Sequence, residues 1–189
     1  MEIIIQKSQE KLEAILKNCL FQYEKITLVG SVATETSLET SDVDFVTYIH
    51  NYNYEDIVKI LENHLEFRGE RIATATTTRL LFCTKIDNHH IDLNIMTEDD
   101  YHSIIKGMYT MKRQLSPEQK QEIVRQKFLL KNSGNKNDYE IYKNSFYQKY
   151  CPEFIWQSDL DIVNNIKDQY IKENKELPAW IIHKISTIK

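Results

Sequence analysis

The sequence predicts an α+β fold, in which a small mixed β-sheet with helices is followed by a helical C-terminal half. Two observations support this prediction. Segments typical of strands and of amphipathic helices alternate up to residue 96, whereas only helical patterns follow from Thr97 onward. The 189 residues are enough for one substantial core. We therefore expect an α+β core over residues 1–98 and a helical region packed on it over residues 99–189.

The first predicted element is an amphipathic helix within residues 7–21. Its apolar residues recur at the spacing of one helix face, and they are Leu12, Ile15, Leu16 and Leu20. A short β-rich run, KITLVG, then ends at Gly30. After a polar loop, the run VDFVTYI over residues 43–49 is rich in β-branched and aromatic side chains, which predicts a strand.

A second helix is predicted over residues 54–67, because its apolar residues again lie on one face: Ile57, Ile60, Leu61 and Leu65. We expect this helix to close at Arg68 and Gly69. Three β-prone segments follow, over residues 71–78, 79–86 and 90–96. The last two are joined by Asp87 and Asn88, a pair that favours a tight turn. These segments complete the predicted mixed sheet.

The rear half carries the signals of helix ends. Ser116, Pro117 and Gln119 form the pattern of an N-cap, a first-turn proline and a capping-box partner. The segment around Gly134 is typical of a helix stop. Further helices are predicted over residues 138–150, 159–173 and 178–185.

The composition is that of a globular protein, with 41% hydrophobic and 28% charged residues. No apolar run approaches the roughly 20 residues of a membrane helix, so we expect no membrane partner. The N-terminal residues mix acids and bases among apolar positions, unlike a secretory signal. Cys19, Cys83 and Cys151 have no metal-ligand spacing. These features predict a cytoplasmic protein with free thiols.

Two aspartates stand inside an apolar run. Alternate side chains of a strand share a face, so Asp42 and Asp44 are expected to project together. Val43 and Phe45 then point into the opposite layer. Neighbouring carboxylates raise each other's cost of ionisation, so we expect a cation between them. Mg²⁺ fits, because it takes a few carboxylate oxygens and leaves its other positions to water and substrate phosphates.

A third aspartate has a similar setting. Asp92 is flanked by Ile91 and Leu93 in an alternating segment. Asp92 and Asn94 are therefore expected to share a face, opposite Ile91, Leu93 and Ile95. If this strand lies beside the strand of the first two aspartates, three carboxylates converge and form a site for two metal ions.

A Gly-Ser pair precedes the aspartates. Gly30 ends a β-rich run, so the loop can turn sharply and a phosphate can approach the backbone without meeting a Cβ. Ser31 adds a hydroxyl, and the residues after it are expected to begin a short helix whose free N–H groups favour an anion. A triphosphate can then lie between this loop and the metal ions.

The order GS, ten residues, DVD and a later strand aspartate resembles the signature of the DNA polymerase β-like nucleotidyltransferase superfamily. The text GSVATETSLETSDVDF looks most like non-canonical poly(A) polymerases and the small bacterial nucleotidyltransferases. This resemblance covers residues 25–96. It implies the polymerase β-like nucleotidyltransferase fold, a small mixed sheet with helices.

The resemblance also implies roles. Gly30 and Ser31 would hold the β- and γ-phosphates of a nucleoside triphosphate. Asp42 and Asp44 would ligate two Mg²⁺ ions, and Asp92 would ligate the catalytic ion beside the attacking group. The implied reaction is in-line displacement at the α-phosphorus with release of pyrophosphate. ATP is the expected donor, and the acceptor is a hydroxyl group on a protein, an RNA or a small molecule.

The chain departs from the superfamily in size. It is expected to be too short for the further domains of template-independent RNA polymerases, and it lacks the helix-hairpin-helix motif of the repair polymerases. This favours a single transfer over processive polymerisation. Two other functions stay open: a catalytically weak antitoxin-like or regulatory binding module of the same fold, and a nucleic-acid-binding protein.

The nucleic-acid alternative depends on a basic segment. Residues 112–150 carry nine Lys or Arg against four Asp or Glu, in a chain of net charge −4. Its basic side chains include Lys112, Arg113, Lys120, Arg125, Lys127 and Lys131. We favour a solvated helix face over contact with a phosphate backbone. Five aromatic residues that follow at helical spacing are expected in the core: Tyr139, Tyr142, Phe146, Tyr147 and Tyr150.

Three further residues leave more than one interpretation. Arg79 either reaches a phosphate from the neighbouring strand or lies at the surface. His89 and His90 lack Cys or Glu at ligand spacing, so a turn or a substrate contact is favoured over a zinc site.

Overall fold

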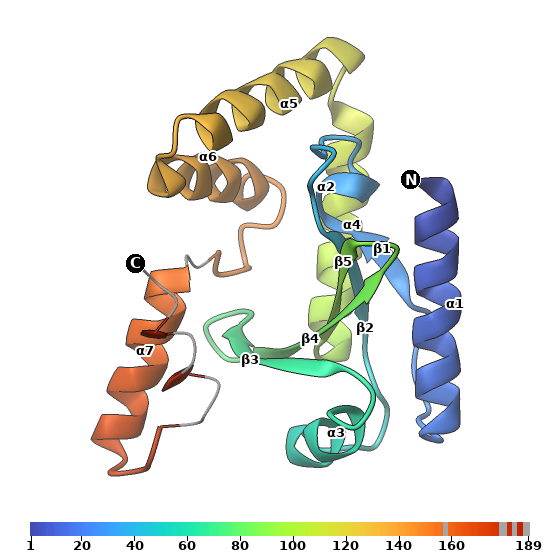
Figure 1. Cartoon of the computed structure of the whole chain (residues 1–189), viewed down its shortest axis with the longest axis vertical. Helices are drawn as coiled ribbons and strands as arrows, with labels where there is room; N and C mark the ends of the chain where they lie inside the picture. Colours follow the sequence, from blue (N-terminus) through green and yellow to red (C-terminus); the bar gives the residue numbers. More distant parts are fainter. Residues whose placement is uncertain (157–158, 178–180, 183–184, 187–189) are drawn as a thin grey trace.

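The computed structural model describes residues 1–156, 159–177, 181–182 and 185–186. A five-stranded sheet with helices forms the front half, and the rear half is helical (Figure 1). The predicted fold class is therefore confirmed. The elements in chain order are α1 (Glu2–Asn18), β1 (Thr27–Val29), α2 (Gly30–Ala33), β2 (Val43–Thr47), α3 (Tyr54–Leu61), β3 (Glu66–Ile72), β4 (Thr78–Ile86), β5 (His89–Ile95), α4 (Glu98–Gln114), α5 (Pro117–Asn132), α6 (Lys136–Gln148) and α7 (Asp159–Lys172).

The strands lie in the order β1-β2-β5-β4-β3. β2 and β5 pair in parallel, and every other neighbouring pair is antiparallel. The sheet is thus mixed, as predicted. β4 and β5 form a hairpin whose two loop residues, Asp87 and Asn88, have φ angles of 47° and 67°. Two successive positive φ angles define a type I′ turn, whose twist matches that of the flanking strands.

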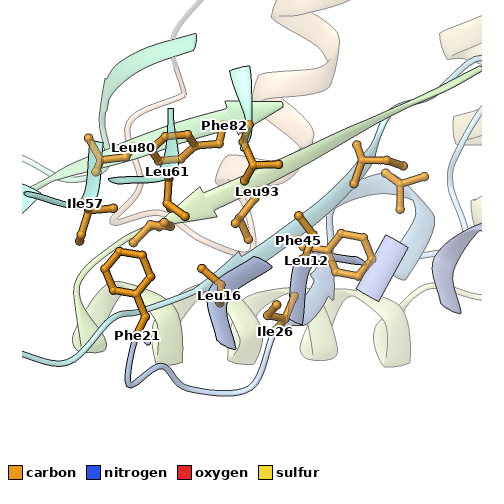
Figure 2. Packing of buried hydrophobic residues seen from close by; sticks show 14 residues of the cluster. Leu12, Leu16, Phe21, Ile26, Phe45, Ile57, Leu61, Leu80, Phe82 and Leu93 are labelled. Atoms are coloured by element: carbon orange, nitrogen blue, oxygen red, sulfur yellow. The ribbon is translucent and has the colours of Figure 1, made fainter. Parts of the chain in front are cut away.

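One face of the sheet is covered by α1 and α3. Figure 2 shows how their apolar residues meet the strands: Leu12, Leu16, Ile57 and Leu61 pack with Phe45, Phe82 and Leu93. The opposite face is covered by α4, whose Tyr101, Ile104, Met108 and Met111 join a second cluster with Val29 and Val46. Because strand side chains alternate, β1 and β2 contribute to both clusters, whereas the apolar residues of β3, β4 and β5 join only the first.

α1 ends earlier than its apolar spacing suggests. Leu20 does not extend the buried face: it is 83% exposed and has a φ of 60°. The amide of Phe21 donates to the carbonyl of Leu16 at 3.1 Å, and the amide of Leu20 donates to Lys17 at 3.0 Å. These bonds form a Schellman motif, in which the residue after the C-cap is left-handed. Phe21 takes the buried position instead.

The second predicted helix is too long. α3 ends at Leu61, and residues 66–72 form β3, so Arg68 and Gly69 lie in a strand rather than at a helix end. Pairing of six β3 residues with β4 outweighs the local helical spacing, since β3 places Phe67 opposite Phe82. Gly69 has a φ of 99° at a shift in this register. The strand predicted over residues 71–78 is correspondingly a loop after Ile72.

The helical half follows the predicted end signals. Ser116 and Gln119 form a complete capping box at α5, with Pro117 in the first turn. Asn135 caps α6, following Gly134, whose φ is 75°. α7 occupies the segment predicted for it. The last predicted helix, over residues 178–185, lies mostly outside the described residues. The boundary at residue 98 stays a prediction, and α4, which begins there, packs on the sheet.

A glycine in α4 permits close contact between this helix and the segment after α6. A Cβ on Gly107 would lie 2.1 Å from Cys151 Sγ and 2.8 Å from the carbonyl oxygen of Tyr150. We expect Gly107→Ala to lower the free energy of unfolding by about 1–3 kcal/mol through overpacking. The helix propensity of alanine, about 1 kcal/mol better than that of glycine, offsets this only in part. Urea denaturation measures the change.

The matched control is the pair Gly107→Ala with Cys151→Ala. Removing the sulfur relieves one of the two clashes, so the double variant should lose less stability than the sum of the single variants. A Gly107→Ala protein that is more stable than the wild type would contradict the close packing.

All three cysteines are free, as predicted. No described helix is long and apolar enough to cross a membrane.

Candidate active site

Two of the predicted acidic residues are direct neighbours on adjacent strands. The parallel register of β2 and β5 places Asp44 opposite Asp92. The row continues on both sides, because Val29 of β1 lies opposite Asp44 and Cys83 of β4 lies opposite Asp92. The juxtaposition expected from the sequence is therefore present.

The alternation within both strands is also as predicted. Val43 and Phe45 of β2 are fully buried in the cluster beneath α1 and α3. Ile91 and Leu93 of β5 join the same cluster. Asp42, Asp44, Asp92 and Asn94 instead line a cavity on the other face of the sheet. Asp42 is exposed and directly precedes β2.

Asp42, Asp44 and Asp92 together are called the acidic row. Gly30 begins α2 and lies against Asp44 of this row. Its φ is +70°, and a Cβ built on it would lie 2.4 Å from Asp44 Oδ2. A side chain at this position would thus have to displace the carboxylate. The predicted short helix is a single turn, Gly30–Ala33, in which the Thr34 hydroxyl donates to the carbonyl of Gly30 at 2.9 Å. The glycine at this position is therefore required both by the backbone and by the neighbouring aspartate.

The carboxylates of the acidic row repel one another. Burial, followed by the charges of Asp92 and Asp42, raises the pKa of Asp44 well above its ordinary value. Burial and Asp42 also raise the pKa of Asp92, although a hydrogen bond from the Cys83 thiol at 3.0 Å lowers it in part. Lys143 and Arg79 partly offset the repulsion at Asp44. A divalent cation would relieve it more effectively, because it attracts all three carboxylates at once.

The cavity is a cleft of about 450 Å³ between the sheet and the helical half. Its floor consists of residues from α2 and the sheet, among them Gly30, Ser31, Asp44, Arg71, Arg79 and Asp92. Its opposite wall comes from α5, α6 and the segment after α6, among them Lys127, Lys131, Tyr139, Lys143, Tyr147 and Trp156. In Figure 1, α5 and α6 lie on the side of the sheet opposite α1. The cleft is thus acidic at one part of its floor and basic on its helical wall.

Lys127 is a buried cation in this wall. It is 2% exposed, and its Nζ donates to the carbonyl of Thr36 at 3.1 Å and lies 5.3 Å from the ring centre of Tyr147. Burial and the neighbouring Lys143 lower the pKa of Lys127 to about 8, while Asp44 opposes this shift. A buried cation with few compensating anions is well placed to contact an anionic ligand.

The basic segment is largely exposed, but several of its side chains also contact distant parts of the chain. Lys112 and Lys120 form ion pairs with Glu35 at 2.9 and 2.6 Å, and Lys131 donates to Thr40 at 2.8 Å. With Lys127, these contacts attach α4 and α5 to the loop between α2 and β2. Arg125 is the other cation of α5. Among the described residues, it pairs with Glu122 of the same helix at 2.8 Å. The preference for a solvated helix face over contact with a phosphate backbone stays a prediction.

Of the five aromatic residues expected in the core, Tyr147 is buried and also lines the cleft, and the other four are half-buried. Tyr147 is buried and stacks on Trp156 with ring centres 5.4 Å apart. Tyr139 lines the cleft. Sequence reasoning did not assign Arg71, Lys143 or Trp156 to the site. The spacing of Lys127 and Lys131, four residues apart on a predicted helix, was the available signal for a basic wall.

The acidic residues suit a hard divalent cation in their chemistry, because all of them are carboxylates and Asp44 and Asp92 are half-buried neighbours. They are not drawn together around one point. Within the described ranges, no group of three or more His, Cys, Asp or Glu side chains has the geometry to hold a metal ion. His89 and His90, at the start of β5 beside the hairpin turn, belong to no such group among the described residues either.

Solved structures resemble this fold at low sequence identity. Cid1 in complex with its short product ApU has a TM-score of 0.45 and 12% identity, over 69% of this chain and 39% of that chain. A cytoplasmic RNA terminal U-transferase has a TM-score of 0.46 and 13% identity, over 73% and 40%. The non-canonical poly(A) polymerase complex GLD-2–GLD-3 has a TM-score of 0.41 and 15% identity, over 59% and 39%.

The chain spans about two fifths of the length of these solved chains. No curated protein matches it significantly by sequence. The profile of the nucleotidyltransferase domain matches residues 10–106, a range that contains Gly30, Ser31 and all three aspartates. This range is more than half of the chain, so the protein belongs to the nucleotidyltransferase domain family.

Proposed function

We propose that the protein is a Mg²⁺-dependent nucleotidyltransferase. It transfers a nucleoside monophosphate from a nucleoside triphosphate, with ATP as the expected donor, to a hydroxyl group on a protein, an RNA or a small molecule. The observation that carries this proposal is the register of the two central strands, which sets Asp44 beside Asp92 and against Gly30. One of the similar solved structures, a Cid1 poly(U) polymerase, has Mg and 3′-dATP bound.

In the proposed site, Asp42, Asp44 and Asp92 would hold two Mg²⁺ ions. When bound, these ions lower the pKa of the attacking hydroxyl and neutralise charge on the leaving pyrophosphate. Asp44 lies opposite Asp92 and two residues from Asp42, so it would contact both ions. Asp92, on the far side from Gly30, would hold the ion beside the acceptor.

The donor triphosphate would lie between Gly30–Ser31 and the basic helical wall. Ser31 offers a hydroxyl, and Lys127 and Lys131 offer cations from one face of α5. The acceptor oxygen attacks the α-phosphorus and loses its proton, the bond from this phosphorus to the bridging oxygen breaks, and pyrophosphate leaves in line with the attack. The protein supplies position and charge for this step rather than a covalent intermediate.

Direct measurement of pyrophosphate release tests the proposal. The purified protein is incubated with each labelled triphosphate, Mg²⁺ and host lysate, and label is sought on protein, RNA and small molecules. We expect release that depends on Mg²⁺ and on a lysate component. Absence of both label transfer and pyrophosphate release, while ATP binding is retained, would reject the enzyme.

That outcome would support the second candidate, a catalytically weak antitoxin-like or regulatory module of the same fold. One observation favours it: the acidic side chains of the described residues are not assembled into a metal-binding group. Its signature is saturable ATP binding without turnover.

Cys83 offers a test of how Asp92 is held. Its Sγ donates to Asp92 Oδ1 at 3.0 Å, and Cys83 itself is 8% exposed. We expect Cys83→Ala to raise the Mg²⁺ concentration for half-maximal pyrophosphate release by about 10- to 100-fold, the usual effect of losing a partner of a metal ligand. Cys83→Ser is the matched control, because its hydroxyl can still donate. Equal Mg²⁺ dependence in both variants would show that the thiol has no such role.

A further inference from the structure

We propose that Arg79, with Arg71 beside it, forms an anion-binding subsite on the acceptor side of the cleft, and that the acceptor carries a phosphate group. The position of the subsite relative to the reaction rests on the proposed transfer function. Its ability to bind phosphate does not.

The two arginines are direct neighbours on the cleft floor. The antiparallel register of β3 and β4 places Arg71 opposite Arg79, and both side chains line the cavity. Residues directly opposite in such a pair have Cβ atoms about 5 Å apart. Arg71 is 7% exposed, and its Nη1 donates to the carbonyl of Glu70 at 2.8 Å. Arg71 is thus anchored, and its positive charge remains next to Arg79.

Arg79 has a hydrogen-bond donor in need of an acceptor. Its Nε is buried and donates to no acceptor among the residues that the structure describes. Leaving a buried donor without a partner is unfavourable, more so when it belongs to a charged group. A guanidinium presents its donors in a planar fork, which matches two oxygens of a phosphate. An anion in the cleft would therefore satisfy Arg79.

Neighbouring acids do not remove this need. Burial and Arg71 lower the pKa of Arg79 to about 10, although Asp44, Asp100 and Asp92 favour its charged form. The side chain is still positively charged at neutral pH. Asp100 is itself engaged, since its Oδ2 accepts a hydrogen bond from the Thr77 hydroxyl at 2.7 Å.

The arginines lie across the acidic row from the phosphate loop. Gly30 follows β1, on one side of Asp44, whereas Arg79 is on β4, on the far side of Asp92. Along β4, Arg79 is four residues from Cys83, the neighbour of Asp92, which corresponds to about 13 Å. Pyrophosphate that leaves toward Gly30 requires the attacking oxygen to arrive from the opposite direction. The arginines lie on that side of the acidic residues, displaced along β4.

A phosphate matches this subsite better than a carboxylate. The Arg79 guanidinium needs an acceptor, and a phosphate monoester dianion offers it more negative charge and more oxygens than a carboxylate does. A carboxylate carries only one negative charge. Ile104 and Met108 of α4 and Trp156 also line the cavity, so the rest of the acceptor would meet apolar and aromatic surface. We therefore place an acceptor with a phosphate group near its reacting hydroxyl on this side of the cleft.

The experiment titrates the full-length protein with inorganic phosphate, without nucleotide or metal, and follows binding by calorimetry. Acetate serves as the monovalent anion. We expect saturable phosphate binding and weaker acetate binding by the wild type. Arg79→Gln should weaken phosphate binding about tenfold or more, as expected for loss of hydrogen bonds to a charged group. Arg79→Lys, which keeps the charge without the fork, should have an intermediate affinity.

Lys85→Gln is the matched control, because it removes an exposed cation of β4 that does not line the cleft. It should leave phosphate affinity within about twofold of the wild type. Unchanged phosphate binding in Arg79→Gln, an equal loss of phosphate binding in Lys85→Gln, or no phosphate binding by the wild type would each overturn the subsite. A wild type that binds phosphate through Arg79 but never releases pyrophosphate would reject the proposed function and retain the subsite.

Circular dichroism checks that the variants fold. Arg79→Gln removes a charge that burial and Arg71 disfavour, so its melting temperature should not fall sharply. If it fails to fold, Arg79→Lys decides: an affinity equal to that of the wild type would overturn the role of the guanidinium fork.

Discussion

We expect Asp44→Asn to abolish the proposed nucleotidyl transfer and to stabilise the metal-free protein. The loss of transfer is expected because Asp44 lies opposite Asp92 and two residues from Asp42, so it would contact both metal ions in the proposed site. We expect the rate of pyrophosphate release to fall by at least about a hundredfold. This exceeds the usual effect of removing a residue that only hydrogen-bonds a metal ligand. The variant should keep the far-ultraviolet circular dichroism spectrum of the wild type.

The gain in stability has an electrostatic origin. The pKa of Asp44 is raised in the folded state by burial and by two like charges. The folded protein therefore binds more protons than the unfolded chain once the pH exceeds the ordinary carboxyl pKa of 3.8. Stability without metal should consequently fall as the pH rises from this value toward the raised pKa. An amide carries no charge, so Asp44→Asn should be more stable at neutral pH by on the order of 1 kcal/mol.

Thermal unfolding from pH 4 upward, in the presence of a chelator, measures this effect. Asp99→Asn is the matched control, since Asp99 is an exposed acid in the first turn of α4 and does not line the cleft. Its profile should follow that of the wild type. If Asp44→Asn also keeps the wild-type pH dependence, or retains full transfer activity, the acidic row does not have the proposed role.

Gly30→Ala gives the second large effect, on both activity and stability. The left-handed φ of +70° alone costs about 1 kcal/mol for a residue with a Cβ. The added methyl group also meets Asp44 Oδ2 at 2.4 Å, so the carboxylate must move. A displacement of about 1 Å in a catalytic group can lower the rate about a hundredfold. Transfer should fall by this order even where the fold is retained.

Gly134→Ala separates the two causes. Gly134 has a similar φ of +75°, but no atom of the described residues lies within 4 Å of a Cβ added there. Its substitution should therefore lower the free energy of unfolding by about 1 kcal/mol and leave transfer unchanged. Urea denaturation and pyrophosphate release are measured on both variants. Equal activities would show that the contact between Gly30 and Asp44 does not matter for transfer.

Local patterns in the sequence determined a large part of this protein. The two-residue period of a strand predicted the face of its strand on which Asp44 or Asp92 lies. This period depends only on the nearest neighbours in the chain. The turn at Asp87 and Asn88 and the capping box at Ser116 were predictable for the same reason, since their hydrogen bonds and φ preferences are local. The spacing from Gly30 and Ser31 to Asp42 and Asp44 is likewise read directly from the sequence.

Only the tertiary structure decided which strands and helices meet. No local pattern states that β2 lies parallel to β5 with Asp44 opposite Asp92, or that β3 places Arg71 opposite Arg79. The end of α3 was missed because strand pairing with β4 outweighs helical spacing. Lys127 is buried through a bond to Thr36, 91 residues away in sequence. Burial and pairing are non-local free energies, and so the charge of the cleft emerges only when the chain is folded.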